Sequence, residues 1–138
     1  MASRTLRQGS ASVTMRVPFA ASSVAVVRQR LRSWMGSEGY SEECVEDGRT
    51  IVSELVANSV RHAQPLADGT IEVTWESTDA ALRFSVTDGG SGTRPRTVHA
   101  PAMALAGRGM SIVETLAASW WLDGSRSHST VHALLQVQ

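Results

Sequence analysis

Two segments with alternating apolar residues follow each other in the middle of the chain with almost no connection between them. They are TIEVTWEST at 70–78 and AALRFSVTD at 80–88. Period-two alternation is typical of strands that bury one face, and two such strands joined by a very short turn form an antiparallel hairpin. The hairpin constrains the fold class, because it places strands next to each other in the sequence rather than on either side of a helix.

The remaining elements also fall into groups of strands and groups of helices. The expected order is strand, helix, helix, hairpin, loop, helix, strand, strand, at 11–17, 22–35, 41–62, 70–88, 89–107, 108–119, 119–124 and 129–137. Ser22 or Ser23 and Ser41 are candidate N-caps of the first two helices. Strands that cluster apart from helices favour an α+β two-layer sandwich over a parallel βαβ fold. We expect one domain over residues 11–138, preceded by a flexible arm at 1–10.

The composition excludes several classes of protein. The 138 residues carry 13 basic and 13 acidic side chains, and this zero net charge argues against a nucleic-acid-binding protein. All basic residues are arginine, which excludes P-loop enzymes, eukaryotic-type protein kinases and Schiff-base enzymes, because each needs a lysine. The single cysteine, Cys44, cannot form an intrachain disulfide. No segment resembles a secretory signal or a membrane span, so we expect a cytoplasmic location.

Polar functional groups lie along one edge of the helix expected at 41–62. At 100° per residue, Asn58 and Arg61 fall within about 40° of Glu54, and His62 lies at the border of this stripe. The opposite, core-facing arc holds Val45, Val52, Leu55, Val56 and Ser59. The stripe is interpreted either as a solvated helix face or as the wall of a cleft. In a cleft, the carboxamide oxygen of Asn58 would suit Mg²⁺, and the carboxylate of Glu54 could orient a nucleophile.

Two glycine segments favour the cleft. VTDGGSG places Asp88 at the end of a strand, followed by Gly90 and Gly92, and GRGMSIV places Gly107 and Gly109 at the entry of a helix. Each segment alone is equally typical of a turn or of a loop before a helix. Together they suit a nucleotide, because an aspartate accepts a hydrogen bond from the adenine amino group and would reject the guanine carbonyl. Glycines allow close backbone approach, and a helix N-terminus attracts phosphate.

In this order, the three segments resemble the nucleotide-binding motifs of the GHKL (Bergerat-fold) ATPases. Glu54-x-x-x-Asn58-x-x-x-His62 resembles the N-box, Asp88-x-Gly90-x-Gly92 the G1 box and Gly107-x-Gly109 the G2 box. SELVANSVRHA and GRGMSIVETLA are similar to the short bacterial anti-sigma-factor serine/threonine kinases. The resemblance covers nearly the whole chain and implies a mixed, mostly antiparallel sheet with helices on one face and ATP between the layers. Residues 93–106 would form the ATP lid.

The resemblance also implies a role for the individual residues. Asp88 would bind adenine, Asn58 would hold Mg²⁺, and Glu54 would be the catalytic base. Further nucleotide-binding positions would be His62, Gly90, Gly92, Gly107, Arg108, Gly109, Met110 and, near the adenine, Thr130. Since the chain has no lysine, Arg108 is the best-placed residue for a charge contact with the γ-phosphate. Met110 replaces the leucine that the family usually has.

By the same resemblance, the protein would bind ATP, sequester a sigma factor and phosphorylate a STAS-type anti-anti-sigma protein, as a homodimer without direct contact to nucleic acid or membrane. Two alternatives stay open. One is a nucleotide-sensing binding module without phosphotransfer. The other is a histidine-kinase-like catalytic domain acting on another chain, because no histidine precedes His62 in this sequence.

Overall fold

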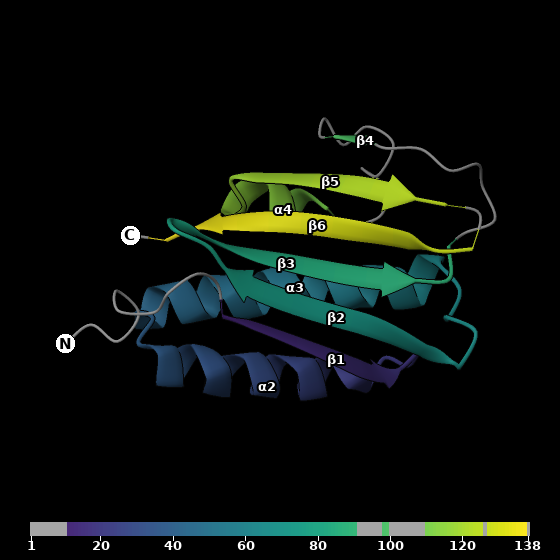
Figure 1. Cartoon of the computed structure of the whole chain (residues 1–138), viewed down its shortest axis with the longest axis horizontal. Coiled ribbons are helices and arrows are strands. Elements are labelled where there is room, and N and C mark those ends of the chain that lie inside the picture. Colours follow the sequence, from purple (N-terminus) through teal and green to yellow (C-terminus); the bar gives the residue numbers. More distant parts are fainter. Residues whose placement is uncertain (1–10, 91–97, 100–109, 126, 138) are drawn as a thin grey trace.

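The computed structural model describes residues 11–90, 98–99, 110–125 and 127–137, and of 98–99 only the backbone (Figure 1). The elements of this part are β1 (Ser12–Pro18), α2 (Ser23–Glu38), α3 (Glu42–His62), β2 (Thr70–Ser77), β3 (Ala81–Asp88), β4 (Val98–His99), α4 (Ser111–Leu116), β5 (Ser119–Gly124) and β6 (Ser129–Gln136). Strands and helices occupy separate layers, so the predicted α+β two-layer fold is confirmed.

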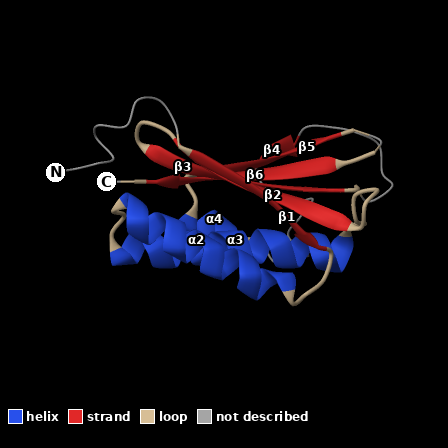
Figure 2. Cartoon of the chain, turned by 60° about the horizontal axis from the view of Figure 1, so that its bottom comes forward, coloured by secondary structure: helices blue, strands red, loops and turns tan. Residues whose placement is uncertain are grey.

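The strands form one sheet in the order β1-β2-β3-β6-β5-β4. Every pairing among the described strands is antiparallel, including the β2–β3 hairpin, in which Trp75 lies opposite Phe84. The pairing of β3 with β6 places Asp88 opposite Ser129 at the end of the two strands. Figure 2 shows that the three described helices cover one face of this sheet and leave the other face uncovered.

The core lies between the helices and the covered face of the sheet. On α3, the five residues expected to face the core are all buried, and Val52, Leu55 and Val56 have no exposed surface. The strands contribute every second residue, as the alternation predicted. These fully buried strand residues are Ile71, Val73 and Trp75 of β2 and Leu82, Phe84 and Val86 of β3.

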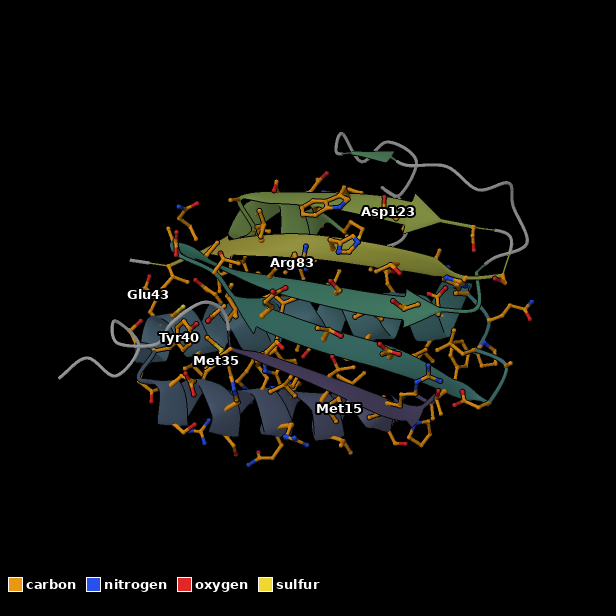
Figure 3. The ribbon with its side chains drawn as sticks, viewed as in Figure 1. Met15, Met35, Tyr40, Glu43, Arg83 and Asp123 are labelled. Carbon is orange, nitrogen blue, oxygen red and sulfur yellow. The ribbon has the colours of Figure 1, made fainter. Side chains whose placement is uncertain are left out.

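The uncovered face of the sheet carries polar side chains that pair across neighbouring strands. The pairs are Thr14 with Thr74 (3.1 Å), Arg83 with Glu76 (2.7 Å), Ser85 with His132 (2.9 Å) and Thr87 with Thr130 (2.7 Å). Figure 3 looks onto this face, with Arg83 and Asp123 labelled. Hydrogen bonding between polar neighbours suits a sheet face that water can reach.

The beginnings of the helices largely follow the predicted caps. The Ser41 hydroxyl accepts a hydrogen bond from the Cys44 backbone N–H at 3.1 Å, which confirms Ser41 as the N-cap of α3. Ser22 lies at the N-cap of α2 without a side-chain cap bond, and the Ser23 hydroxyl instead donates to the Pro18 carbonyl at 2.7 Å. None of the described helices is both long and apolar enough to cross a membrane.

Two helix ends differ from the prediction. α2 continues past its expected end at residue 35 to Glu38, where Gly39 ends it with a left-handed backbone (φ +88°). The last helix was expected to reach residue 119 but ends at Leu116. The Ala118 N–H donates to the Leu134 carbonyl of β6 at 2.7 Å, so sheet pairing ends this helix early. The two-residue strand β4 was not expected and lies within the predicted lid.

Candidate functional site

Asp88 is a buried carboxylate at the end of a strand. It is the last residue of β3 and continues the buried alternation of that strand, with only 5% of its surface exposed. Its Oδ2 atom accepts a hydrogen bond from the Ser59 hydroxyl of α3 at 2.7 Å. Its Oδ1 atom accepts from the Gly90 backbone N–H at 2.8 Å and from the Ser129 hydroxyl of β6 at 3.1 Å. The carboxylate therefore joins the helix layer to two strands.

The backbone after Asp88 turns against the segment that follows α3. The Gly89 N–H donates to the Gln64 carbonyl at 2.7 Å, and the Gln64 N–H donates to the Gly90 carbonyl at 3.0 Å. A Cβ atom on Gly89 would lie 2.0 Å from the Pro65 carbonyl oxygen, so only glycine fits there. Gly90 has a φ of +85°, a conformation that glycine adopts readily. These two glycines fix the direction in which the chain leaves β3.

Asn58 lies on α3, directly before Ser59, and is half-buried. Its Nδ2 group donates a hydrogen bond to the Met110 sulfur at 2.8 Å. Its Oδ1 atom is buried and has no hydrogen-bond partner among the residues that the structure describes. A buried carboxamide oxygen without a partner is costly unless a ligand or water satisfies it. Met110 is itself buried and holds the amide so that this oxygen stays available.

Glu54 lies one helical turn before Asn58 on the same face of α3. Its side chain is half-buried and makes no hydrogen bond or ion pair within the described part of the chain. His62, the third residue of the predicted N-box, is the last residue of α3 and is exposed. The helix thus presents a carboxylate and a carboxamide in sequence along one edge, as its spacing predicted.

Thr130 is not brought to Asp88. Its hydroxyl lies 2.7 Å from that of Thr87, on the uncovered face of the sheet. Because side chains alternate along a strand, the preceding residue, Ser129, points to the covered face and reaches Asp88 instead. Thr130 therefore lies away from Asp88, and its neighbour Ser129 is the β6 residue that contacts this carboxylate. The contact of Thr130 with the adenine stays a prediction.

Part of the predicted site lies outside the described residues. This part comprises Gly92, Gly107, Arg108, Gly109 and nearly all of the expected lid at 93–106. The expected arm at 1–10 also lies outside the described residues. Of the G1 box, Asp88 and Gly90 are described, and of the residues near the G2 box, Met110. The structure therefore describes the predicted adenine-binding end and the N-box helix, but most of the predicted phosphate-binding half lies outside it.

The described groups fit the chemistry of a nucleotide and its metal ion. A buried carboxylate is an acceptor for an amino group, and the partnerless Asn58 Oδ1 is a hard oxygen ligand. In the described ranges, no cluster of three or more His, Cys, Asp or Glu side chains could hold a metal ion. Mg²⁺ is usually bound by one or two protein oxygens together with phosphates and water, and the Asn58 Oδ1 atom could supply one of them.

Sequence reasoning missed three contributors to this site. Ser59 was assigned to the core, and Ser129 and Gly89 were given no role. Ser59 is indeed buried, with 6% of its surface exposed, but a buried hydroxyl needs a partner, and that requirement was the available signal. The roles of Ser129 and Gly89 follow from strand register and from a backbone contact between distant segments. Neither is visible in the local sequence.

Comparisons with known proteins show the family to which this chain belongs. A family model described as the histidine kinase-like ATPase domain matches residues 17–132. Serine-protein kinase RsbW of Listeria innocua serovar 6a is 30% identical over 116 residues, which cover 75% of this chain and 74% of that protein. Serine-protein kinase RsbW of Staphylococcus epidermidis is 31% identical over 80 residues, which cover 56% of this chain and 50% of that protein.

A solved structure supports the fold. The crystal structure of the RsbU and RsbW domains of Rv1364c from Mycobacterium tuberculosis matches 92% of this chain with a TM-score of 0.71 at 20% sequence identity. The match covers 32% of that longer chain, so this chain spans about a third of it. Since the family model extends from β1 to β6 and the relative from Listeria matches three quarters of the sequence, the chain belongs to the histidine kinase-like ATPase domain family.

Proposed function

We propose that this protein is an ATP-dependent serine/threonine protein kinase of the anti-sigma-factor type. The observation that carries the proposal is the pair of groups on α3. The Asn58 Oδ1 atom is buried without a partner in the described residues, and Glu54 lies one turn before it. Both lie on α3, and Ser59, the residue after Asn58, donates a hydrogen bond to Asp88. One helix thus joins a candidate base, a candidate metal ligand and a candidate adenine site.

In this proposal, ATP binds between the helices and the sheet. The adenine amino group donates to Asp88, which is a buried acceptor of hydrogen bonds. The side-chain oxygen of Asn58 is the protein ligand for Mg²⁺, held in place by the bond from its Nδ2 group to Met110. Bound Mg²⁺ supplies charge neutralisation on the phosphate oxygens. Arg108 and the glycines of the G1 and G2 boxes are proposed to hold the phosphates.

Glu54 is the proposed catalytic base. It orients the hydroxyl of the acceptor residue and accepts its proton while the γ-phosphoryl group passes from ATP to the hydroxyl oxygen and ADP leaves. A carboxylate without a partner among the described residues is available for this role. A base of this kind contributes about 10²- to 10⁴-fold to a rate.

We further propose the partners that the family resemblance implied. The acceptor is a serine or threonine of a STAS-type anti-anti-sigma protein, and the kinase also sequesters a sigma factor. It acts in the cytoplasm as a homodimer. The serine-protein kinase names of the curated relatives support the choice of a hydroxyl acceptor on a protein.

The roles are tested by phosphotransfer from MgATP to the STAS-type protein of the same organism. Glu54→Ala is expected to bind ATP and to lose about 10²- to 10⁴-fold in rate. Asn58→Ala is expected to lose both Mg²⁺-dependent ATP affinity and transfer. Glu46→Ala is the matched control, because Glu46 lies on the same helix, is largely exposed and pairs with Arg49 at 2.8 Å. Its rate should equal that of the wild type.

Undiminished transfer in both site variants would refute the assigned roles. Wild-type protein that binds ATP but forms no phosphorylated product with the true partner would favour a nucleotide-sensing module instead. Product on a histidine rather than a hydroxyl would favour a histidine-kinase-like activity.

A further inference from the structure

The two oxygens of Asp88 differ in how many hydrogen bonds they already accept. Oδ1 accepts two, from the Gly90 backbone N–H at 2.8 Å and from the Ser129 hydroxyl at 3.1 Å. Oδ2 accepts one, from the Ser59 hydroxyl at 2.7 Å. A carboxylate offers about four acceptor positions, roughly two on each oxygen. Donors in the described residues therefore fill both acceptor positions of Oδ1. One acceptor position of Oδ2 is left for a ligand.

Ser59 shares this oxygen with the incoming ligand. Its side chain is buried, with 6% of its surface exposed, and it comes from α3, the helix that carries Glu54 and Asn58. The hydroxyl occupies one acceptor position on Oδ2 and thereby fixes the direction of the other. A purine with an amino group at position 6 can donate into that direction. A purine with a carbonyl there would place acceptor against acceptor.

We infer that Ser59 is a positioning residue that aims Asp88 Oδ2 at the purine 6-amino group and so determines the preference for ATP. The inference deepens the proposed function and rests on it. It adds that the helix with the metal and base positions also controls recognition of the nucleobase. The inference also gives the two serines different roles. Ser129 donates to Oδ1, and this oxygen still accepts from the Gly90 N–H when the Ser129 hydroxyl is removed.

The test is the energetic coupling between the Ser59 hydroxyl and the 6-amino group. Dissociation constants of ATP and of purine riboside triphosphate, which lacks the 6-amino group, are measured by calorimetry with the full chain. Wild-type protein is expected to bind the analogue at least tenfold more weakly than ATP. Ser59→Ala should weaken ATP by about tenfold and the analogue by less than about twofold, so that the ratio of the two constants collapses.

Two further serines are the controls. Ser129→Ala should keep the ratio within about threefold of the wild-type value. Ser53→Ala should leave both constants unchanged, because the Ser53 hydroxyl on the same helix donates to the Arg49 backbone carbonyl at 2.6 Å and not to Asp88. Ser59→Thr retains the hydroxyl and should retain the ratio, which keeps the test readable if the alanine variant is poorly folded. Thermal unfolding of each variant identifies any such loss of structure.

Several results would overturn the inference. An equal weakening of both nucleotides in Ser59→Ala would show that Ser59 only supports the fold. A larger change of the ratio in Ser129→Ala than in Ser59→Ala would assign the ligand to Oδ1. If a folded Ser59→Thr protein no longer distinguished ATP from the analogue, the hydroxyl at position 59 would not be what determines nucleobase recognition. Wild-type protein that binds neither nucleotide would overturn the proposed function as well, whereas the first three results leave that function intact.

Discussion

Two hydrogen-bonded clusters, on opposite faces of the sheet, each contain an aspartate and a serine. On the covered face, Asp88 accepts from Ser59 and Ser129 and has 5% of its surface exposed. On the uncovered face, Asp123 contacts His132 at 3.1 Å, His132 contacts Ser85, and the Asp123 side chain is 51% exposed. The chemical groups are similar, but water can complete the second cluster and cannot readily reach the first.

The clusters also differ in the elements that they connect. Asp88 is held by α3, by the turn after β3 and by β6, so its hydrogen bonds join the two layers. The contacts of Asp123 with His132 and of His132 with Ser85 connect strands of the sheet, namely β5, β6 and β3. Hydrogen bonds are stronger in a buried, less polar environment, and an unsatisfied group costs more there. The comparison teaches that burial and position between layers, rather than residue type, make Asp88 the candidate ligand-binding group.

The largest expected change in ATP affinity comes from replacing Asp88, and the same replacement of Asp123 is its comparison. Asp88→Asn replaces an acceptor oxygen by an amino donor that would face the donor of adenine, so ATP should bind on the order of 100-fold more weakly. Asp123→Asn should change ATP affinity by less than about twofold, because exposed polar contacts contribute little. Calorimetric titration with MgATP measures both. ATP affinity in Asp88→Asn within threefold of wild type would contradict the difference between the clusters.

A second prediction concerns the turn that follows Asp88. Gly89→Ala would place a Cβ atom 2.0 Å from the Pro65 carbonyl oxygen, which is backbone and cannot move aside cheaply. We expect a loss of about 2–3 kcal/mol in the free energy of unfolding, as for other overpacked positions.

Gly36→Ala is the matched control for that variant. Gly36 lies inside α2, and apart from its chain neighbours and the adjacent helix backbone no described atom lies within 4 Å of an added Cβ, so alanine should stabilise the helix by about 0.5–1 kcal/mol. Urea unfolding of both variants measures these changes. A Gly89→Ala protein as stable as the wild type would show that the close contact with Pro65 is readily relieved.

Local sequence patterns were sufficient to predict the elements that build the core between the helices and the sheet. The core arc of α3, the hairpin of β2 and β3 and the Ser41 cap depend on spacing and on local hydrogen bonds, and all three are present. What spacing could not supply was the register between distant strands. Thr130 and Ser129 are adjacent, and only the pairing of β3 with β6 decides which of them faces Asp88.

The misjudged end of α4 has the same cause. α4 contains six residues because the chain beyond it pairs with β6, and a pattern of apolar residues carries no information about that partner. Within the site, the stripe of Glu54 and Asn58 was visible because both lie on one helix. The hydrogen bond from Ser59 to Asp88 joins residues 29 positions apart in the sequence and needed the packed layers to become visible.

The smallest expected effect is a pH dependence confined to the uncovered face. Burial lowers the pKa of His132 below its ordinary value of 6.5, Asp123 opposes this shift, and Arg83 adds to it. In the unfolded chain the imidazole therefore binds a proton at a higher pH than in the folded protein. Where the unfolded state holds more protons, stability rises with pH. The contribution is thus intact above pH 6.5 and is lost progressively as the pH falls below that value.

Urea unfolding at pH 7.5, 6.5 and 5.5 measures this slope, and subtraction of the His132→Gln data isolates it from the other histidines. The slope should be shallow in the wild type, because Asp123 favours the charged imidazole and so offsets part of the effect of burial on His132. Asp123→Asn should steepen it, since the carboxylate that favours the charged imidazole is gone. ATP affinity should not follow the transition, because the sheet separates His132 from Asp88. Parallel stability curves for wild type and His132→Gln would contradict the assignment, and an ATP affinity that follows the same titration would show that the two faces are coupled.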